Sequence, residues 1–351
     1  MIANISNILK NPLWRNTLKL SSSSVLMYFV PLVVTPILSR IYDQSAFGEW
    51  GVFSSTVTII GIGIFAGYEN AIILSKNDVE TRQLCFLNIL ISLSFIFLLI
   101  ILFWIGKYTD LSYFESFPSL TIFGIYLVFF ALLGILQNLS NLNENYAVMT
   151  FGNVIQGSAQ ALFRILFGFL ILPWNTNGLI LGTTIAIIIT TTYYIYQLKS
   201  KLRSIISNMP NILEIKTTLI RHRYFPLYDA PAQLLSFAAF NLPLIILSLY
   251  FSMADIGCYS MILQLLLIPM SFIGSAMGKV YYKQISVAPK YGEDIKRLTI
   301  QSLRLTSYIS ILPLLFIALG GDYILVAFLG AKWHMAGNIA LCLAIPSEKT
   351  I

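Results

Sequence analysis

Long apolar runs recur along the whole chain, and short polar stretches separate them. Each run is close to the roughly 20 residues that an α-helix needs to cross a hydrocarbon layer of about 30 Å. We therefore predict an all-α polytopic transmembrane bundle. The predicted spans are about ten in number and lie at 20–39, 50–74, 84–106, 118–139, 147–172, 177–197, 231–251, 256–277, 303–320 and 334–346.

Lysine and arginine fall mainly on one side of these spans. With the N-terminus inside, alternate loops place almost all of them on the cytoplasmic side. Only Arg40, Lys107 and Lys332 fall on outer loops, and Arg164 lies within a span. Because cytoplasmic loops carry an excess of positive residues, this distribution predicts a cytoplasmic N-terminus. The net charge of +7 then reflects topology, and no nucleic-acid partner is expected.

Composition supports the bilayer as the main partner of the chain. The sequence is 57% hydrophobic and 11% charged, with a mean hydropathy of +0.78, which excludes a water-soluble globular protein. Cys85, Cys258 and Cys342 lie far apart and form no CxxC pair or His/Cys cluster. Neither a disulfide framework, a metal site nor a cofactor is therefore predicted. The polar, basic N-terminus lacks the apolar core of a removable signal peptide.

A basic inner loop at 199–223 divides the chain into two predicted lobes. The N-terminal six-helix lobe covers 1–198, and the C-terminal lobe covers 224–351. A sparse internal repeat supports this division, because the segment from Val34 aligns without gaps on the segment from Pro243 and pairs Gly48 with Gly257. Two related halves are typical of alternating-access transporters. A second half as long as the first would continue further, so we expect the C-terminal lobe to be truncated by two helices.

A polar stripe runs along the predicted fifth span. At 100° per residue, Asn153, Gln156, Gln160 and Arg164 fall within about 80° of one another. Because an intramembrane charge costs from about 2.5 to over 10 kcal/mol, we expect this stripe to face a hydrated cavity and to bind substrate. Arg164 would pair there with a phosphate or an acidic sugar. The alternative is structural, with Arg164 satisfying helix-end carbonyls or a carboxylate.

Carboxylates mark the inner ends of two further spans. Glu69 lies about 7 Å deep at 1.5 Å per residue and is a coupling-ion or gating candidate, with pairing to an inner-end cation as the alternative. Asp229 begins the seventh span, and Gln233 follows one turn later, so both are candidates of the same kind. Pro226, Pro231 and Pro243 predict that this helix is interrupted. Simple helix-start chemistry, with Asp229 as a cap, explains the same residues.

The remaining polar and aromatic groups predict no catalysis. The serines at 21–24 and the threonines of TTIAIIITTT in the sixth span are expected to bond back to their own backbone. Trp50 and Trp104 are expected to be lipid-facing or interfacial anchors. His222 and His334 form no triad or metal constellation, so no catalytic residue is predicted and the chain is not expected to be an enzyme.

Three segments carry a family resemblance: GYENAIILSKNDVETRQL at 67–84, the segment 223–282 that begins RYFPLYDAPAQLL, and AFLGAKWHMAGN at 327–338. Together they resemble the bacterial polysaccharide exporters of the O-antigen flippase (Wzx) type. That family belongs with the multidrug and toxin extruders in the multidrug/oligosaccharidyl-lipid/polysaccharide superfamily. The resemblance implies a two-lobed, MATE-like fold of twelve helices, of which about ten are present here.

The resemblance also implies a function. It implies an inner-membrane flippase that moves an undecaprenyl-pyrophosphate-linked oligosaccharide, an O-antigen unit of lipopolysaccharide or a capsular repeat, to the periplasmic face by alternating access. A proton or sodium gradient would drive it, and a polysaccharide polymerase and a chain-length regulator would be its protein partners.

Two other functions remain open from the sequence. A multidrug-type, cation-coupled exporter would be favoured by a carboxylate deep in the first span, and 20–39 contains none. A membrane glycosyltransferase or polysaccharide polymerase would need a large outer loop or an acidic metal-binding pair, and the sequence shows neither.

Overall fold

The computed structural model describes residues 30, 33–108, 119–170, 177–207, 209–266, 299–300, 304, 323 and 325–344. The serines at 21–24 and most of the predicted span 303–320 lie outside these residues. The chain forms two compact units, which comprise 1–31 with 49–252, and 32–48 with 253–351. The predicted lobe boundary within 199–223 stays a prediction.

The regular structure of the described residues is helical. The main helices are α3 (Gln44–Phe65), α4 (Tyr68–Ile73), α5 (Asp78–Tyr108), α7 (Leu120–Leu142), α8 (Tyr146–Leu170), α9 (Gly178–Gln197), α10 (Lys199–Ser207), α11 (Ile212–Arg221), the π-helical turn η2 (Phe225–Asp229), α12 (Ala230–Leu247), the 3₁₀ turn η3 (Ala331–Trp333) and α15 (His334–Ala344). A further apolar helix covers Met253–Leu266.

Among the described residues, five helices are long and apolar enough to cross a membrane: Gln44–Phe65, Asp78–Gly106, Leu120–Leu142, Gly178–Gln197 and Phe225–Leu247. α8 is also long, at 25 residues, but its polar stripe lowers its hydropathy. Phe97 and Trp104 of α5 are 67% and 62% exposed. This outward apolar face suits contact with lipid, as predicted for Trp104.

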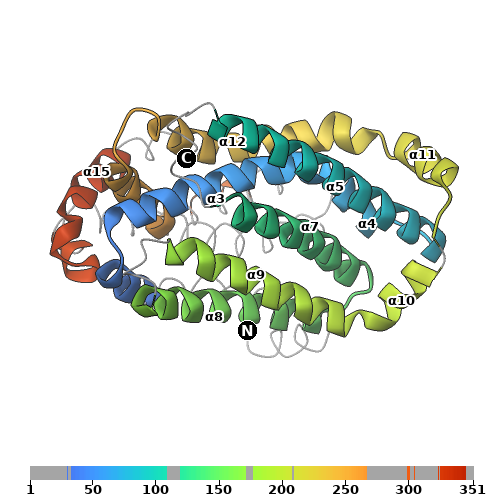
Figure 1. Ribbon diagram of the computed structural model, residues 1–351, viewed down its shortest axis with the longest axis horizontal. Coiled ribbons are helices and arrows are strands. Elements are labelled where there is room, and N and C mark those ends of the chain that lie inside the picture. Colours follow the sequence, from blue (N-terminus) through green and yellow to red (C-terminus); the bar gives the residue numbers. More distant parts are fainter. Residues whose placement is uncertain are drawn as a thin grey trace. The chain divides into compact units, whose positions relative to one another are not determined.

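Helices α7, α8 and α9 of the first unit pack side by side, as Figure 1 shows. Glycines bring α8 and α9 close together: a Cβ at Gly152 would lie 2.5 Å from the Tyr194 ring, and one at Gly182 would lie 2.7 Å from the Arg164 backbone nitrogen. Small residues at such contacts let membrane helices approach. The core of the unit includes the buried side chains of Phe53, Ile64, Ile72, Leu84, Leu87, Phe123, Leu127, Leu139, Leu179, Ile180 and Tyr194.

The second predicted span is broken in the structure. The sequence predicts one helix over 50–74, but α3 starts earlier, at Gln44, and ends at Phe65, and a separate α4 follows. Ala66 and Gly67 between them have φ angles of 50° and 79°. Glycine adopts such left-handed angles readily. A Cβ at Gly67 would also lie 3.1 Å from the Phe225 carbonyl oxygen, so the break packs against η2.

The threonines of α9 behave as predicted. Thr183, Thr184, Thr190, Thr191 and Thr192 each donate a hydrogen bond to the carbonyl oxygen four residues earlier, over 2.7–2.9 Å. These bonds satisfy the hydroxyls within the helix. Most of this group is therefore structural, and only Thr183 takes part in the site described below.

The second unit contains a reciprocal helix crossing. A Cβ at Gly48 would clash with the Met253 carbonyl oxygen, and one at Gly257 would clash with the Gln44 carbonyl oxygen. The internal repeat pairs Gly48 with Gly257 and Gln44 with Met253, so each half makes the same contact on the other. Reciprocal contacts of this kind are typical of two-fold symmetry, and they support the internal repeat.

Candidate functional site

Arg164 of α8 is 3% exposed and points into the first unit. Its Nη2 donates a hydrogen bond to Thr183 Oγ1 over 2.8 Å, and its Nε lies 3.3 Å from the same oxygen. The guanidinium carbon lies 4.5 Å from the centroid of the Trp50 ring, which is the geometry of a cation–π contact. Three helices, α3, α8 and α9, thus contribute contacts to the cation.

Local sequence explains this placement. Gly182 lets the backbone of α9 approach Arg164. Thr183 donates its proton to the Leu179 carbonyl oxygen over 2.7 Å, so its oxygen is turned to accept from the guanidinium. Trp50 is half-buried against Arg164, so its prediction as a lipid-facing or interfacial anchor is corrected. The cation–π contact was missed because the two residues are far apart in the sequence.

The other residues of the predicted stripe follow Arg164 along α8. Asn153, Gln156 and Gln160 are half-buried, while Phe151, Leu162 and Phe169 on other faces of the helix are exposed. Arg164 lies six residues before the last residue of α8, about 9 Å along the axis. The polar residues therefore run inward from near one end of the helix. Their contact with a substrate stays a prediction.

The sequence does not single out Glu49, because the predicted second span begins one residue later, at 50. The structure includes it in α3, where its Oε2 accepts a hydrogen bond from Asn177 Nδ2 over 2.8 Å. Asn177 also caps α9 by accepting from the Leu179 amide over 3.1 Å. The earlier start of α3 thus places a carboxylate near the end of the unit where Arg164 lies. A carboxylate directly before Trp50, at the start of an apolar run, is the sequence feature that could have indicated Glu49.

Asp229 and Gln233, two of the gating candidates, come together at the opposite end of the first unit. Asp229 Oδ2 accepts hydrogen bonds from Asn70 Nδ2 over 2.8 Å and from Gln233 Nε2 over 2.9 Å. Glu69 precedes Asn70 and lies within electrostatic reach of Asp229. Its Oε2 is buried and has no hydrogen-bond partner in the part of the chain that the structure describes. The sequence indicates Glu69 and Asp229 as separate candidates, but it does not indicate that the two lie close together.

Proline explains the shape of this cluster. Pro226 lies in the π-turn η2, and Pro231 is near the start of α12. Because proline has no amide hydrogen, it is tolerated at helix starts and prevents regular bonding elsewhere. The helix is nevertheless continuous over Phe225–Leu247, so the predicted interruption is corrected: Pro226 lies in a π-helical first turn, and Pro243 lies inside α12 without ending it.

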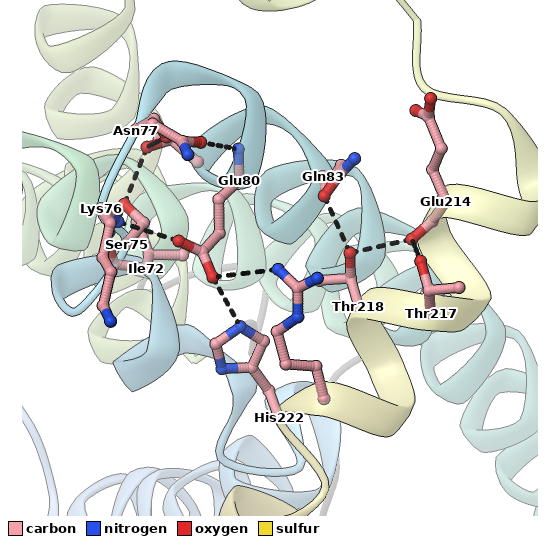
Figure 2. Close-up of polar contacts among 12 residues, drawn as sticks. Ile72, Ser75, Lys76, Asn77, Glu80, Gln83, Glu214, Thr217, Thr218 and His222 are labelled. Carbon is pink, nitrogen blue, oxygen red and sulfur yellow. Dashed lines mark hydrogen bonds and ion pairs between the residues drawn. The ribbon is translucent and has the colours of Figure 1, made fainter.

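A third polar cluster ties α11 to the turn before α5 (Figure 2). Glu80 Oε1 lies 3.1 Å from His222 Nε2 and 3.8 Å from Arg221 Nη1. Its other oxygen accepts from the Lys76 amide over 2.9 Å. Glu80 lies in the first turn of α5, so these contacts link that turn to the end of α11. The sequence did not indicate the pair of Glu80 and His222, which is separated by 142 positions.

Comparisons with known proteins agree with this architecture. The sequence profile of a family described as "Polysaccharide biosynthesis protein" matches residues 37–337. The crystal structure of a MATE mutant is similar with a TM-score of 0.54 and 14% identity, and the match covers 96% of this chain and 80% of that chain. No curated protein matches the sequence. The MATE-like helical fold predicted from the sequence is therefore confirmed.

Proposed function

Since the chain belongs to the polysaccharide biosynthesis protein family and has the fold of a MATE transporter, we propose that it is a flippase for lipid-linked oligosaccharides. Its membrane helices and its family favour a multi-pass transporter over an enzyme. The proposed substrate is an undecaprenyl-pyrophosphate-linked repeat unit of O-antigen or capsule. The protein would carry it from the cytoplasmic to the periplasmic face of the inner membrane.

The buried cation Arg164 is the observation that best supports an anionic, hydrophilic substrate. A charge inside a membrane protein is costly unless it is functional or well paired. Its contacts with Thr183 and Trp50 orient the guanidinium within the first unit. A guanidinium is the side chain best suited to a pyrophosphate, because it can donate two parallel hydrogen bonds. Gln160, Gln156 and Asn153 would supply amides to the sugar along the same helix.

The cluster of Glu69, Asp229 and Gln233 is proposed to gate or couple transport. It joins α4, which follows the break in the second span, to the π-turn that begins α12. Broken helices with polar partners are frequent moving elements in transporters. Binding of a proton or sodium ion at these carboxylates would change the strength of the contacts between α4 and η2. This change would shift the balance between the two states of alternating access. The N-terminus would be cytoplasmic, and a polysaccharide polymerase and a chain-length regulator would act on the product.

The proposal is tested in cells that lack the native copy and express a variant. Arg164→Ala should reduce surface polysaccharide by about tenfold to a hundredfold, the effect of losing a charged hydrogen bond worth about 1.5–3 kcal/mol. Arg164→Lys should retain part of the activity, because it keeps the charge but loses the paired geometry. Arg304→Ala removes an exposed arginine and serves as the matched control. Normal polysaccharide from Arg164→Ala, at equal protein level, would remove Arg164 from the transport path.

A further inference from the structure

The helix α11 carries an apolar face that is exposed among the residues that the structure describes. Ile212 and Leu213 are 82% and 69% exposed, and Leu219 and Ile220 are exposed as well. At 100° per residue these four side chains share an arc of about 120°, and Lys216 falls in its middle. Glu214, which is also exposed, lies about 160° from Lys216 and therefore well outside this arc. An exposed apolar patch of this kind marks a surface that contacts a partner or a membrane.

The opposite side of α11 is held by the protein, which fixes the direction of the apolar face. Thr218 is buried and donates a hydrogen bond to Gln83 of α5 over 3.0 Å, as Figure 2 shows. The Tyr68 hydroxyl donates to the Leu219 carbonyl oxygen over 3.1 Å. His222, directly after the helix, meets Glu80. The helix therefore cannot turn to bury its apolar side chains against the first unit without breaking these contacts.

Both ends of the linker formed by α10 and α11 are attached to candidate membrane spans. α10 follows α9 directly, and η2 begins the span Phe225–Leu247 shortly after α11. Helices of 9 and 10 residues are about 14–15 Å long, so neither can cross the bilayer. The linker must therefore lie near one membrane surface. The distribution of lysine and arginine predicts that this surface is the cytoplasmic one.

Tyrosines paired with cations stand at the two ends of this linker. Tyr196 and Tyr224 are 65% and 60% exposed. Lys199 Nζ lies 4.9 Å from the centroid of the Tyr196 ring, and the Arg223 guanidinium lies 5.8 Å from that of Tyr224. Tyrosine is enriched where a membrane protein meets the headgroups. We therefore expect the two ends of the linker to lie at the level of the lipid headgroups.

We propose that the linker 199–223 docks on the cytoplasmic leaflet and binds anionic phospholipid. Its basic side chains outnumber its one acidic residue, Glu214, and comprise Lys199, Lys201, Arg203, Lys216, Arg221 and Arg223. A basic amphipathic helix with a bare apolar face is the form that lies in a membrane interface and prefers anionic lipids. The charge and the attachment to two spans favour a lipid surface over a protein partner. This proposal does not depend on the transported substrate.

Spin labels on two faces of α11 test the docking. Ile212→Cys and Glu214→Cys, which lie about 160° apart on the helix, are labelled with a nitroxide in the full chain, in nanodiscs of phosphatidylcholine with phosphatidylglycerol. The wild-type chain, treated identically, gives the background from Cys85, Cys258 and Cys342. A docked helix makes the label at 212 collide mainly with oxygen, which dissolves in lipid. The label at 214 then collides mainly with a water-soluble nickel complex.

Lipid charge is tested with a single substitution and its control. In discs that contain phosphatidylglycerol, Lys216→Gln should lower the ratio of docked to undocked helix about fivefold, the effect of one basic residue near an anionic surface. Discs of phosphatidylcholine alone should show no such effect. Lys76→Gln removes an exposed lysine from the α4–α5 turn and should change nothing. Equal nickel collisions at 212 and 214, or an unchanged ratio in Lys216→Gln, would overturn the proposal.

Discussion

Gly182→Ala is the sharpest test of how the protein holds its buried cation. The added methyl group would lie 2.7 Å from the Arg164 backbone nitrogen and 2.8 Å from Arg164 Cγ, whereas ordinary contacts are 3.4–4 Å. Because the nearest atom belongs to the backbone, it cannot rotate away. Helices α8 and α9 would have to separate by about 0.7 Å, and overpacking of this kind costs about 1–3 kcal/mol.

Two effects of this substitution oppose each other. Alanine is favoured over glycine within a helix by about 1 kcal/mol, which offsets part of the clash. Gly124→Ala in α7 provides the same gain without the clash, because its methyl group would lie 3.6 Å from Ile100 Cδ1. The difference in stability between the two variants should therefore equal the full overpacking cost of about 1–3 kcal/mol.

Thermal unfolding of both purified variants in the same detergent measures this difference. At about 2–4 °C per kcal/mol for a unit of this size, Gly182→Ala should unfold about 2–12 °C below Gly124→Ala. It should also transport less, since Arg164 moves away from Trp50. Equal unfolding temperatures for the two variants would refute the close α8–α9 contact on which the site depends.

The remaining predictions concern the partners in the three clusters. Thr183→Val removes the acceptor for Arg164 and should lower the free energy of unfolding by about 1–3 kcal/mol, and an unchanged denaturation midpoint would contradict this. Asp229→Ala leaves two amide donors without their acceptor and should cost a similar amount, whereas Asp229→Asn, which keeps one acceptor, should lose less in the same assay. Glu80→Gln removes the carboxylate that meets His222 and Arg221. The amides of α11 should therefore be less protected from hydrogen exchange at neutral pH, relative to their intrinsic exchange rates, than in the wild type; equal protection would show that this contact does not hold the helix.

Apolar run length predicted the helical elements of this protein well. The spans at 118–139, 147–172 and 177–197 correspond to α7, α8 and α9, because a run that must satisfy its own backbone in lipid has few alternatives to a helix. The break at Gly67 was missed. One glycine in an apolar run is common, and only its contact with the Phe225 carbonyl distinguishes this position.

The candidate site was predicted residue by residue but not as a set of contacts. A charge in an apolar helix is visible in sequence, so Arg164 was identified. Its partners Trp50 and Thr183 are ordinary residues of other helices, and only packing selects them. The same applies to Glu80 and His222, whose pairing depends on how the linker folds back on α5.

The most direct test of the flippase proposal is transbilayer movement in proteoliposomes. An undecaprenyl-pyrophosphate-linked oligosaccharide is placed in one leaflet, and its arrival in the other is followed with a glycosidase that acts only from that side. The wild-type protein should move the lipid, and Arg164→Ala should slow it by about tenfold to a hundredfold. Movement no faster than in protein-free liposomes, from wild-type protein that is folded and correctly inserted, would contradict the proposed function.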